Sequence, residues 1–267
     1  MISKNQQIIN RSIIKIKKDG YTVIKNYIKK NDVKKLLNLV NKNYSKTKNI
    51  RYKGRPKRDT EDKVVYNLQN KDFSFIKLLS GKIITEIGKY FLNDEYYRFL
   101  PNDKSNFVLS YFNARSSGKK LDLHIDSFIP FTGKRTTVMQ FLFLLEDSTK
   151  ENGCTTVVKG SHLSGKYTNR KTKNVTNVTG KAGDLMIWDS RLWHGTLKNY
   201  TKKSRWAIVT TFTTWWIKPT MQIVASLPKS IYKKCDKYQK QRLGFCAIPP
   251  KNEFERVNTK SNYKTLK

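Results

Sequence analysis

The chain has 267 residues, of which 37% are hydrophobic, and 54 Lys and Arg against 20 Asp and Glu give it a formal net charge of +34. This length and apolar content fit one domain with a full core better than two, and they exclude a wholly disordered chain. No apolar run approaches the roughly 20 residues that cross a bilayer, and the N-terminus lacks the apolar core of a secretory signal. With three cysteines at unrelated spacings, we expect free thiols and a cytoplasmic protein without a transmembrane segment.

The basic residues are spread along most of the chain. One interpretation is an anionic partner, such as nucleic acid, a membrane surface or a phosphorylated substrate. The other is compositional, because Lys, Asn and Ile are all abundant, as an AT-rich genome would make them. Nucleic-acid binders usually gather their charge in a patch or tail. We therefore favour the compositional interpretation and keep a small anionic substrate as compatible with the charge.

Two helices and a strand are expected at the N-terminus. Alternating apolar and basic residues predict a helix over 5–18, which Asp19-Gly20 ends before a short strand at 21–24. Asn31-Asp32 are expected to cap a second helix, whose apolar stripe runs at helical spacing as far as Tyr44.

A polar and basic loop is expected over 46–63, which contains Gly54 and Pro56. Five of its basic side chains form the best single candidate for an anion site, although a solvated loop is the simpler interpretation: Arg51, Lys53, Arg55, Lys57 and Arg58. A third helix is predicted over 73–92 from its spaced apolar residues, which include Ile84 and Tyr90.

Short β-rich segments alternate with turn residues in the middle of the chain. Seven strands are predicted, at residues 107–112, 121–126, 136–145, 155–158, 174–179, 184–188 and 206–216. Many short strands with glycine-containing turns indicate an all-β sandwich or barrel, and a jelly roll of two packed sheets fits this pattern. Its open mouth offers a pocket for metal and ligand. Residues 46–63, 114–120 and 164–174 are expected to be loops that shape this pocket.

We expect a single domain over 1–267, mainly β with flanking helices. Residues 1–105 form a mainly helical support, 106–216 the β core, and 217–267 a C-terminal helical segment and tail. Within that segment a helix is predicted over 228–242, with Ile231, Cys235 and Tyr238 on its inner side.

The chemistry of the chain is concentrated between residues 121 and 216. The three histidines all lie there, and His124-Ile125-Asp126 with the distant His194 offers two ring nitrogens and one carboxylate. Three such ligands on one face of an octahedron bind Fe(II) in non-haem oxygenases. On an extended strand His124 and Asp126 would share a face. A histidine bonded to a neighbouring carboxylate is the simpler alternative, and it would be preferred if the triplet stood alone.

Arg205 lies eleven residues after His194, at the head of an apolar run. A turn over 198–204 would bring it back beside the metal. An unpaired guanidinium is costly to bury, and the carboxylate of a bound dicarboxylic acid would pair with it through a fork of donors. A surface position in a very basic protein is the alternative.

This segment resembles the phytanoyl-CoA dioxygenase family of Fe(II)/2-oxoglutarate-dependent oxygenases. The matching residues, in register, are His124-Ile125-Asp126, Glu151-Asn152-Gly153-Cys154, Gly160-Ser161-His162, Gly183-Asp184, His194-Gly195 and Arg205. Weaker similarity is found at Asp19-Gly20-Tyr21 and from Trp215-Trp216 to Pro219.

The resemblance implies a double-stranded β-helix with His124, Asp126 and His194 as iron ligands and catalytic residues. It also implies that 2-oxoglutarate chelates the iron through its keto acid end, with its far carboxylate on Arg205. Dioxygen would take the remaining position, and the products would be succinate, carbon dioxide and a hydroxylated small molecule. Related halogenases have Gly or Ala in place of Asp126, so a carboxylate there favours hydroxylation.

Further contacts to the co-substrate are expected from the neighbouring strands. Gln140 would be a polar side chain on an otherwise apolar face with Leu142, which occupies the position where family members more often have Trp. Tyr111 and Asn113, on the strand before the metal ligands, are further candidates. A packing role is the alternative for each. His162 is expected to be structural.

Two alternatives to a small-molecule hydroxylase are kept open. The same chemistry on a nucleic-acid base predicts a contiguous basic surface around the pocket and steep salt dependence. A non-catalytic basic protein that binds nucleic acid on this scaffold would be expected to lose metal ligands first, and here the set is complete.

Overall fold

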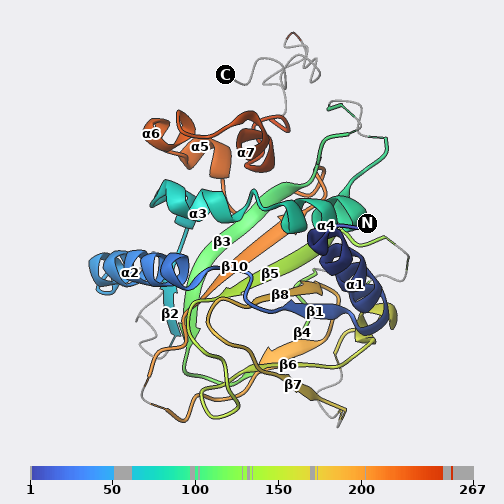
Figure 1. Ribbon diagram of the computed structural model, residues 1–267, viewed down its shortest axis with the longest axis vertical. Helices are drawn as coiled ribbons and strands as arrows, with labels where there is room; N and C mark the ends of the chain where they lie inside the picture. The colour runs from blue at the N-terminus through green and yellow to red at the C-terminus, as the bar shows by residue number, and fades with distance from the viewer. Residues whose placement is uncertain are drawn as a thin grey trace.

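The computed structural model contains two antiparallel sheets, with helices gathered over one of them (Figure 1). It describes residues 2–50, 62–96, 100, 101, 103–127, 129, 130, 133, 135–168, 172, 174–201, 203–248 and 254. The basic cluster predicted within 51–58 lies outside the described residues, as does most of the tail after residue 248.

The six-stranded sheet has the order β1-β8-β5-β10-β3-β2, and the four-stranded sheet has the order β4-β9-β6-β7. The strands are β1 Tyr21–Ile24, β2 Asp62–Val65, β3 Val108–Ser117, β4 Leu121–His124, β5 Val138–Leu144, β6 Thr155–Val157, β7 Thr176–Val178, β8 Leu185–Asp189, β9 His194–Thr196 and β10 Ala207–Thr213. The helices are α1 Lys4–Asp19, α2 Lys30–Thr47, α3 Phe73–Leu78, α4 Lys82–Leu92, α5 Ile223–Ser226, α6 Lys229–Tyr232 and α7 Lys237–Arg242, with single 3₁₀ turns at Leu68–Asn70 and Ser161–Leu163. Together the two sheets form the double-stranded β-helix that the sequence resemblance implied.

Side-chain alternation along β5 separates the core from the site. Phe141 and Phe143 are fully buried among apolar residues of α1, α2 and α4. Leu142 and Leu144 face the opposite way, where they pack with Val157 of the four-stranded sheet. Successive side chains of a strand point to opposite faces, so one face of the large sheet is covered by helices and the other faces the second sheet.

Several predicted elements agree with the structure to within a few residues. The first helix, the strand at 21–24 and all seven strands of the β core are present. Gly20 ends α1 in the left-handed conformation with φ of 85°, a geometry that glycine adopts without strain.

Other predictions about the helices were wrong. The predicted helix over 73–92 is two helices, α3 and α4, because the chain turns at Ser80-Gly81. Gly81 has no room for a side chain, since a Cβ there would lie 2.2 Å from the Tyr27 hydroxyl. The second helix begins at Lys30 without a side-chain cap, so Asp32 lies in its first turn and does not cap it. Tyr90, one of the apolar positions from which the helix over 73–92 was predicted, is 54% exposed.

The predicted helix over 228–242 is divided into α6 and α7. Asp236 accepts a hydrogen bond from the Gln239 amide and starts a new helix with a capping box. Ile231 and Cys235 are buried as expected, whereas Tyr238 is 52% exposed. Because a new helix starts at Asp236, Tyr238 does not continue the apolar face that Ile231 and Cys235 form.

Strand limits also differ from those predicted. β3 continues to Ser117, so 114–117 is strand and not loop, and β2 occupies residues 62–65, where 62 and 63 were predicted to be loop. β4 ends at His124, which leaves Asp126 in the bend that follows the strand.

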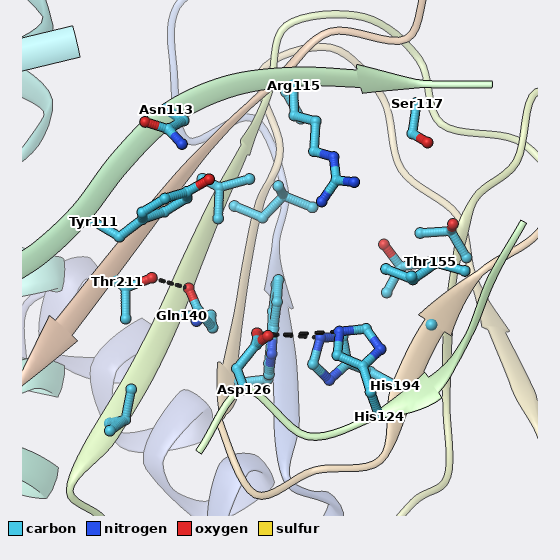
Figure 2. Close-up of a pocket in the computed structure, with 18 of the residues that line it drawn as sticks. Tyr111, Asn113, Arg115, Ser117, His124, Asp126, Gln140, Thr155, His194 and Thr211 are labelled. Carbon is cyan, nitrogen blue, oxygen red and sulfur yellow. Dashed lines mark hydrogen bonds and ion pairs between the residues drawn. The ribbon is translucent and has the colours of Figure 1, made fainter. Parts of the chain in front are cut away.

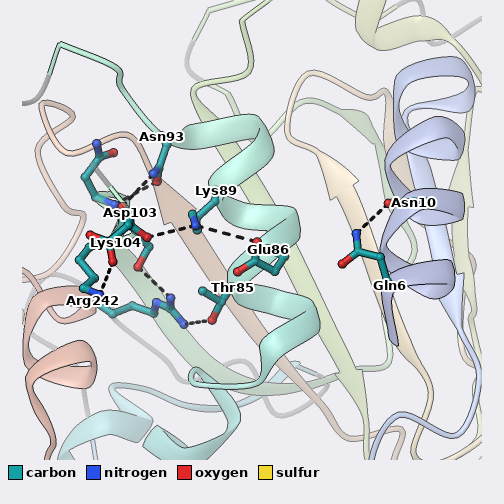
Figure 3. A network of polar contacts seen from close by, with 11 residues as sticks. Gln6, Asn10, Thr85, Glu86, Lys89, Asn93, Asp103, Lys104 and Arg242 are labelled. Atoms are coloured by element: carbon teal, nitrogen blue, oxygen red, sulfur yellow. Dashed lines mark hydrogen bonds and ion pairs between the residues drawn. The ribbon is translucent and has the colours of Figure 1, made fainter. Parts of the chain in front are cut away.

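Arg242 attaches the C-terminal segment to the rest of the protein. It is 3% exposed, and its guanidinium donates to the Leu79 carbonyl, to Thr85 Oγ1 at 3.1 Å and to Ser105 Oγ at 3.1 Å (Figure 3). The guanidinium also lies over the Phe107 ring at 4.6 Å. Burial among neutral groups lowers the pKa of Arg242 to about 10. A single side chain thus links α7 to α4 and to the entry of β3.

No helix in the described part of the chain is both long and apolar enough to cross a lipid bilayer.

Asp184 joins β8 to the segment between β1 and α2. Its carboxylate, 1% exposed, accepts hydrogen bonds from Lys25 Nζ at 2.8 Å and from the amides of Asn26 and Lys181 at 2.9 Å each. Burial opposes the charge, but these donors outweigh it and hold the pKa of Asp184 below its usual value. A carboxylate with a lowered pKa in the folded protein stabilises the fold above the unfolded pKa and loses that effect as the pH falls through the folded one.

We expect Asp184→Asn to lower the free energy of unfolding at pH 7 by about 2 kcal/mol, because charged hydrogen bonds to a buried group are lost. The difference from wild type should narrow below a pH of about 4, where the free carboxyl protonates. Urea unfolding at several pH values measures this. Glu86→Gln is the control, since Glu86 makes only a 3.9 Å ion pair with Lys89 and is 39% exposed. A difference in the free energy of unfolding between Asp184→Asn and wild type that does not change with pH would contradict this role of Asp184.

Candidate metal centre and active site

Two strands of the four-stranded sheet bring the predicted metal ligands together. His124 at the end of β4 is paired in register with His194 at the start of β9. The Asp126 carboxylate faces both rings from one side, with its oxygens 3.5 Å from His124 Nε2 and 3.2 Å from His194 Nε2 (Figure 2). One ligand atom from each residue lies within 4.8 Å of the other two.

The bend after β4, and not the strand itself, directs Asp126 to the histidines. The amides of Asp126 and Ser127 both donate to the Ser190 carbonyl, at 2.9 and 3.0 Å. The prediction that His124 and Asp126 share one face of a strand was therefore wrong. The two side chains do meet, but the bend after the strand brings them together. His194 begins the short strand β9, which was not among the predicted strands.

Both imidazoles are oriented by the backbone. His124 Nδ1 lies 2.9 Å from the Asp122 carbonyl, and His194 Nδ1 lies 2.9 Å from the Leu192 carbonyl. In the tautomer in which Nδ1 carries the proton, each ring directs the lone pair of Nε2 towards Asp126. Two neutral imidazoles and one carboxylate are a suitable donor set for Fe(II), with open positions for other ligands.

The charges within the cluster are coupled. Loss of hydration opposes ionisation of Asp126, but the charges and hydrogen bonds of His194 and His124 lower the pKa of Asp126. Burial also disfavours the charged form of His124, yet the Asp126 carboxylate raises the pKa of His124. Asp126 is thus an ionised, acceptor-only group, which is the state a metal requires.

The cluster opens into a cavity of about 320 Å³ between the two sheets. Its lining includes every predicted site residue and the inward-facing side chains of β10: Tyr111, Asn113, His124, Asp126, Gln140, Leu142, His194, Arg205, Ala207, Val209, Thr211 and Thr213. Both an apolar wall and a polar wall are present, as in pockets that bind small ligands.

Arg205 is the charged group at one end of this cavity. It is 7% exposed, and Nε of Arg205 and Oγ1 of Thr196, both in the cavity lining, have no hydrogen-bond partner among the described residues. Burial lowers the pKa of Arg205. An uncompensated buried guanidinium is costly, and a ligand carboxylate would supply the missing acceptor. The far carboxylate of 2-oxoglutarate therefore fits these two groups.

The weaker candidates lie on the polar wall. Gln140 Oε1 accepts a 2.7 Å hydrogen bond from Thr211, and Asn113 Oδ1 accepts one from the Asn67 amide at 3.0 Å (Figure 2). Burial raises the pKa of Tyr111 to about 12, so its hydroxyl stays protonated. All three contribute to the cavity surface, and their contact with a co-substrate stays a prediction.

His162 is separate from the cluster, as expected. It is 3% exposed, its Nε2 lies 3.3 Å from the Lys17 carbonyl, and its ring packs against Gly20. Its role is to join the 3₁₀ turn after β6 to the end of α1.

Sequence reasoning missed several cavity residues, among them Thr196, Trp188 and Arg115. Thr196 lies two residues after His194 on β9, so strand periodicity from His194 is a signal that would have found it. Trp188 has its ring centroid 5.2 Å from that of His194. Arg115 had no signal in so basic a sequence.

Comparison with known proteins decides the family. The model of the phytanoyl-CoA dioxygenase (PhyH) family matches residues 16–207. The chain belongs to the phytanoyl-CoA dioxygenase family. The match covers His124, Asp126, His194 and Arg205, and it confirms the resemblance found in the sequence.

The curated relatives that the chain matches are distant in sequence. An uncharacterized protein of Mycobacterium tuberculosis is 29% identical over 109 residues, and the match spans 40% of this chain and 40% of that protein. The dioxygenase himG of Aspergillus japonicus is 22% identical over 221 residues, which are 72% of this chain and 68% of himG.

Solved structures share the fold. The epimerase SnoN in complex with Fe3+, alpha ketoglutarate and nogalamycin RO has a TM-score of 0.62 at 19% identity, covering 84% of this chain and 91% of SnoN. HygX from Streptomyces hygroscopicus with nickel, 2-oxoglutarate and hygromycin B has a TM-score of 0.59 at 16% identity, covering 82% and 90%.

We expect His194→Ala to weaken Mn(II) or Fe(II) binding by more than about 100-fold, because loss of supporting groups alone costs 10- to 100-fold. Anaerobic calorimetric titration of the metal measures it. His162→Gln is the matched control and should bind metal as wild type does. Equal loss in both variants would contradict the assignment of the cluster.

Proposed function

We propose that this protein is an Fe(II)- and 2-oxoglutarate-dependent dioxygenase that hydroxylates a carbon of a small molecule in a cytoplasmic setting. One observation carries the proposal: the His124, Asp126 and His194 cluster faces the same cavity as Arg205, whose Nε has no hydrogen-bond partner among the described residues. Family membership supports it. We further propose that the whole chain, 1–267, acts as one oxygenase domain.

In this proposal the cluster holds iron through His124 Nε2, His194 Nε2 and an Asp126 oxygen. Arg205 and the Thr196 hydroxyl hold the far carboxylate of 2-oxoglutarate, which directs the keto acid end towards the metal. When bound, iron and 2-oxoglutarate together activate dioxygen, so that one oxygen atom enters the substrate and the other enters succinate as carbon dioxide leaves.

The remaining cavity residues position the reactants. Gln140, fixed by Thr211, and Asn113, fixed by Asn67, present amide groups whose orientation is set before a ligand arrives. The apolar side chains Leu142 and Val209 form part of the cavity wall, where they would keep water from the reactants. Asp126 completes the ligand set, which favours hydroxylation over halogenation.

A small molecule is the proposed substrate class. A cavity of about 320 Å³ suits a co-substrate and part of a compact substrate. SnoN and HygX, which share the fold, were solved with nogalamycin RO and hygromycin B. Burial of all three cysteines, none of them in a disulfide, agrees with a reducing compartment.

Succinate release with Fe(II), 2-oxoglutarate and dioxygen tests the proposal. Iron-dependent succinate formation is expected in the wild type, with stimulation by a true substrate, and none is expected in His194→Ala. Absence of any succinate, or its persistence in His194→Ala, would contradict the proposal.

We expect Arg205→Gln to raise the KM for 2-oxoglutarate by about 10- to 100-fold, the equivalent of the 1.5–3 kcal/mol of hydrogen bonds to a charged group. The initial rate of succinate formation over a range of 2-oxoglutarate concentrations measures it. Arg205→Lys keeps the charge but not the paired donors, and its KM should lie in between. An unchanged KM in Arg205→Gln would exclude this role.

A further inference from the structure

A second guanidinium points into the cavity from β3. Arg115 lies opposite Ala207 of β10 in the register, and its side chain extends from β3 into the pocket on the side away from the metal cluster (Figure 2). Alternate residues of β3 share this face, so Tyr111, Asn113, Arg115 and Ser117 form one polar row along it.

Asp62 on the neighbouring strand β2 holds Arg115 by one edge only. Nε donates to Oδ1 at 2.8 Å and Nη2 donates to Oδ2 at 2.7 Å. A guanidinium has five N–H donors, so this fork uses two of them. Nη1 has no hydrogen-bond acceptor among the residues described. The side chain of Arg115 is 42% exposed and that of Asp62 is 22% exposed, so the free edge is open to a ligand.

The proposed co-substrate leaves this edge unused. Its keto acid end belongs at the metal and its far carboxylate at Arg205, which is buried and whose Nε has no hydrogen-bond partner in the described part of the chain. Arg115 lies near enough for its charge to oppose that on Arg205 and to lower the pKa of Arg205 further, after burial. Such a pair of guanidiniums on one cavity favours a second acceptor of negative charge.

The fork with Asp62 also makes the free edge rigid. A guanidinium whose rotamer is already fixed loses little entropy when it binds, and its paired N–H groups match the spacing of carboxylate and phosphate oxygens. Asp62 lies behind the guanidinium, so the nearest charge that a ligand meets is positive. The protonated Tyr111 hydroxyl, four residues before Arg115 on the same face of β3, supplies a further donor.

We propose that Arg115, oriented by Asp62, is the substrate-recognising residue of this cavity and binds a carboxylate or phosphate group of the primary substrate. This inference rests on the proposed function, in which 2-oxoglutarate occupies Arg205. It places the anionic group of the substrate on β3 and its reacting carbon towards the metal cluster.

Anion binding to the complete protein tests the proposal. The protein is loaded with Mn(II) and saturating 2-oxoglutarate without oxygen, and inorganic phosphate and acetate are titrated separately at constant ionic strength, with thermal unfolding and calorimetry as readouts. Saturable binding of at least one anion is expected. Arg115→Gln should weaken it by about 10-fold or more, and the preferred anion distinguishes phosphate from carboxylate.

Arg135→Gln is the matched control. Arg135 also pairs with an aspartate, Asp94 at 3.3 Å, and is 45% exposed, but it does not line this cavity. It should bind the anions as wild type does. If Arg115→Gln does not fold because Asp62 is left alone, the double variant Asp62→Asn/Arg115→Gln removes both charges together and takes its place.

The outcomes separate the two proposals. Anion binding that is independent of Arg115 overturns the substrate assignment and leaves the proposed function intact. A 2-oxoglutarate affinity that falls as far in Arg115→Gln as in Arg205→Gln would assign Arg115 to the co-substrate, and it also overturns the assignment. Failure of 2-oxoglutarate to bind the Mn(II)-loaded wild type overturns the proposed function itself.

Discussion

The alternation of side chains along the inner strands of the six-stranded sheet is the constraint on which both the core and the site depend. On β5, Phe141 and Phe143 are buried against the helices, while Gln140 and Leu142 line the cavity. A shift of register by one residue would exchange these two sets completely. The helices therefore act on the site indirectly. By burying the aromatic face of the sheet, they determine which face is left for ligands.

The cavity contains polar groups that the protein alone does not satisfy. Arg205 is buried, and its Nε has no hydrogen-bond partner among the described residues. Asp126 faces Nε2 of two imidazoles whose Nδ1 atoms lie at hydrogen-bond distance from backbone carbonyls. Such groups cost folding free energy, which the large apolar core offsets. A metal ion and a dicarboxylate would satisfy both ends of the cavity at once. Ligand binding and stability are therefore coupled, since a ligand that binds only the folded state stabilises it.

Local signals predicted much of this structure, and interactions distant in sequence account for the rest. The glycine after α1, the seven strands of the β core and the spacing from His194 to Arg205 were visible because each depends on neighbouring residues or a short repeat. Tyr27 leaves no room for a side chain at Gly81, where the predicted helix is interrupted, and the Ser190 carbonyl holds the bend that directs Asp126. No local pattern encodes such contacts.

Arg115 is a cavity residue that the sequence alone could not single out. Among 54 basic residues nothing distinguishes it in the sequence, and only the pairing of β2 with β3 places Asp62 behind it. The start of a new helix at Asp236 lies between these two cases. Its capping box is a local signal, but the apolar spacing across the same residues favours one continuous helix. Motifs thus identified the three residues that the structure brings together as a candidate metal site, and the fold was needed to find what surrounds them.

The central claim is that metal and 2-oxoglutarate share one cavity and bind to each other as well as to the protein. Calorimetric titration of 2-oxoglutarate into the wild type without oxygen, with and without Mn(II), tests it most directly. The account predicts that the metal tightens binding by at least about 10-fold, or 1.4 kcal/mol. Equal affinity with and without metal would place 2-oxoglutarate away from His124, Asp126 and His194, and would contradict the account.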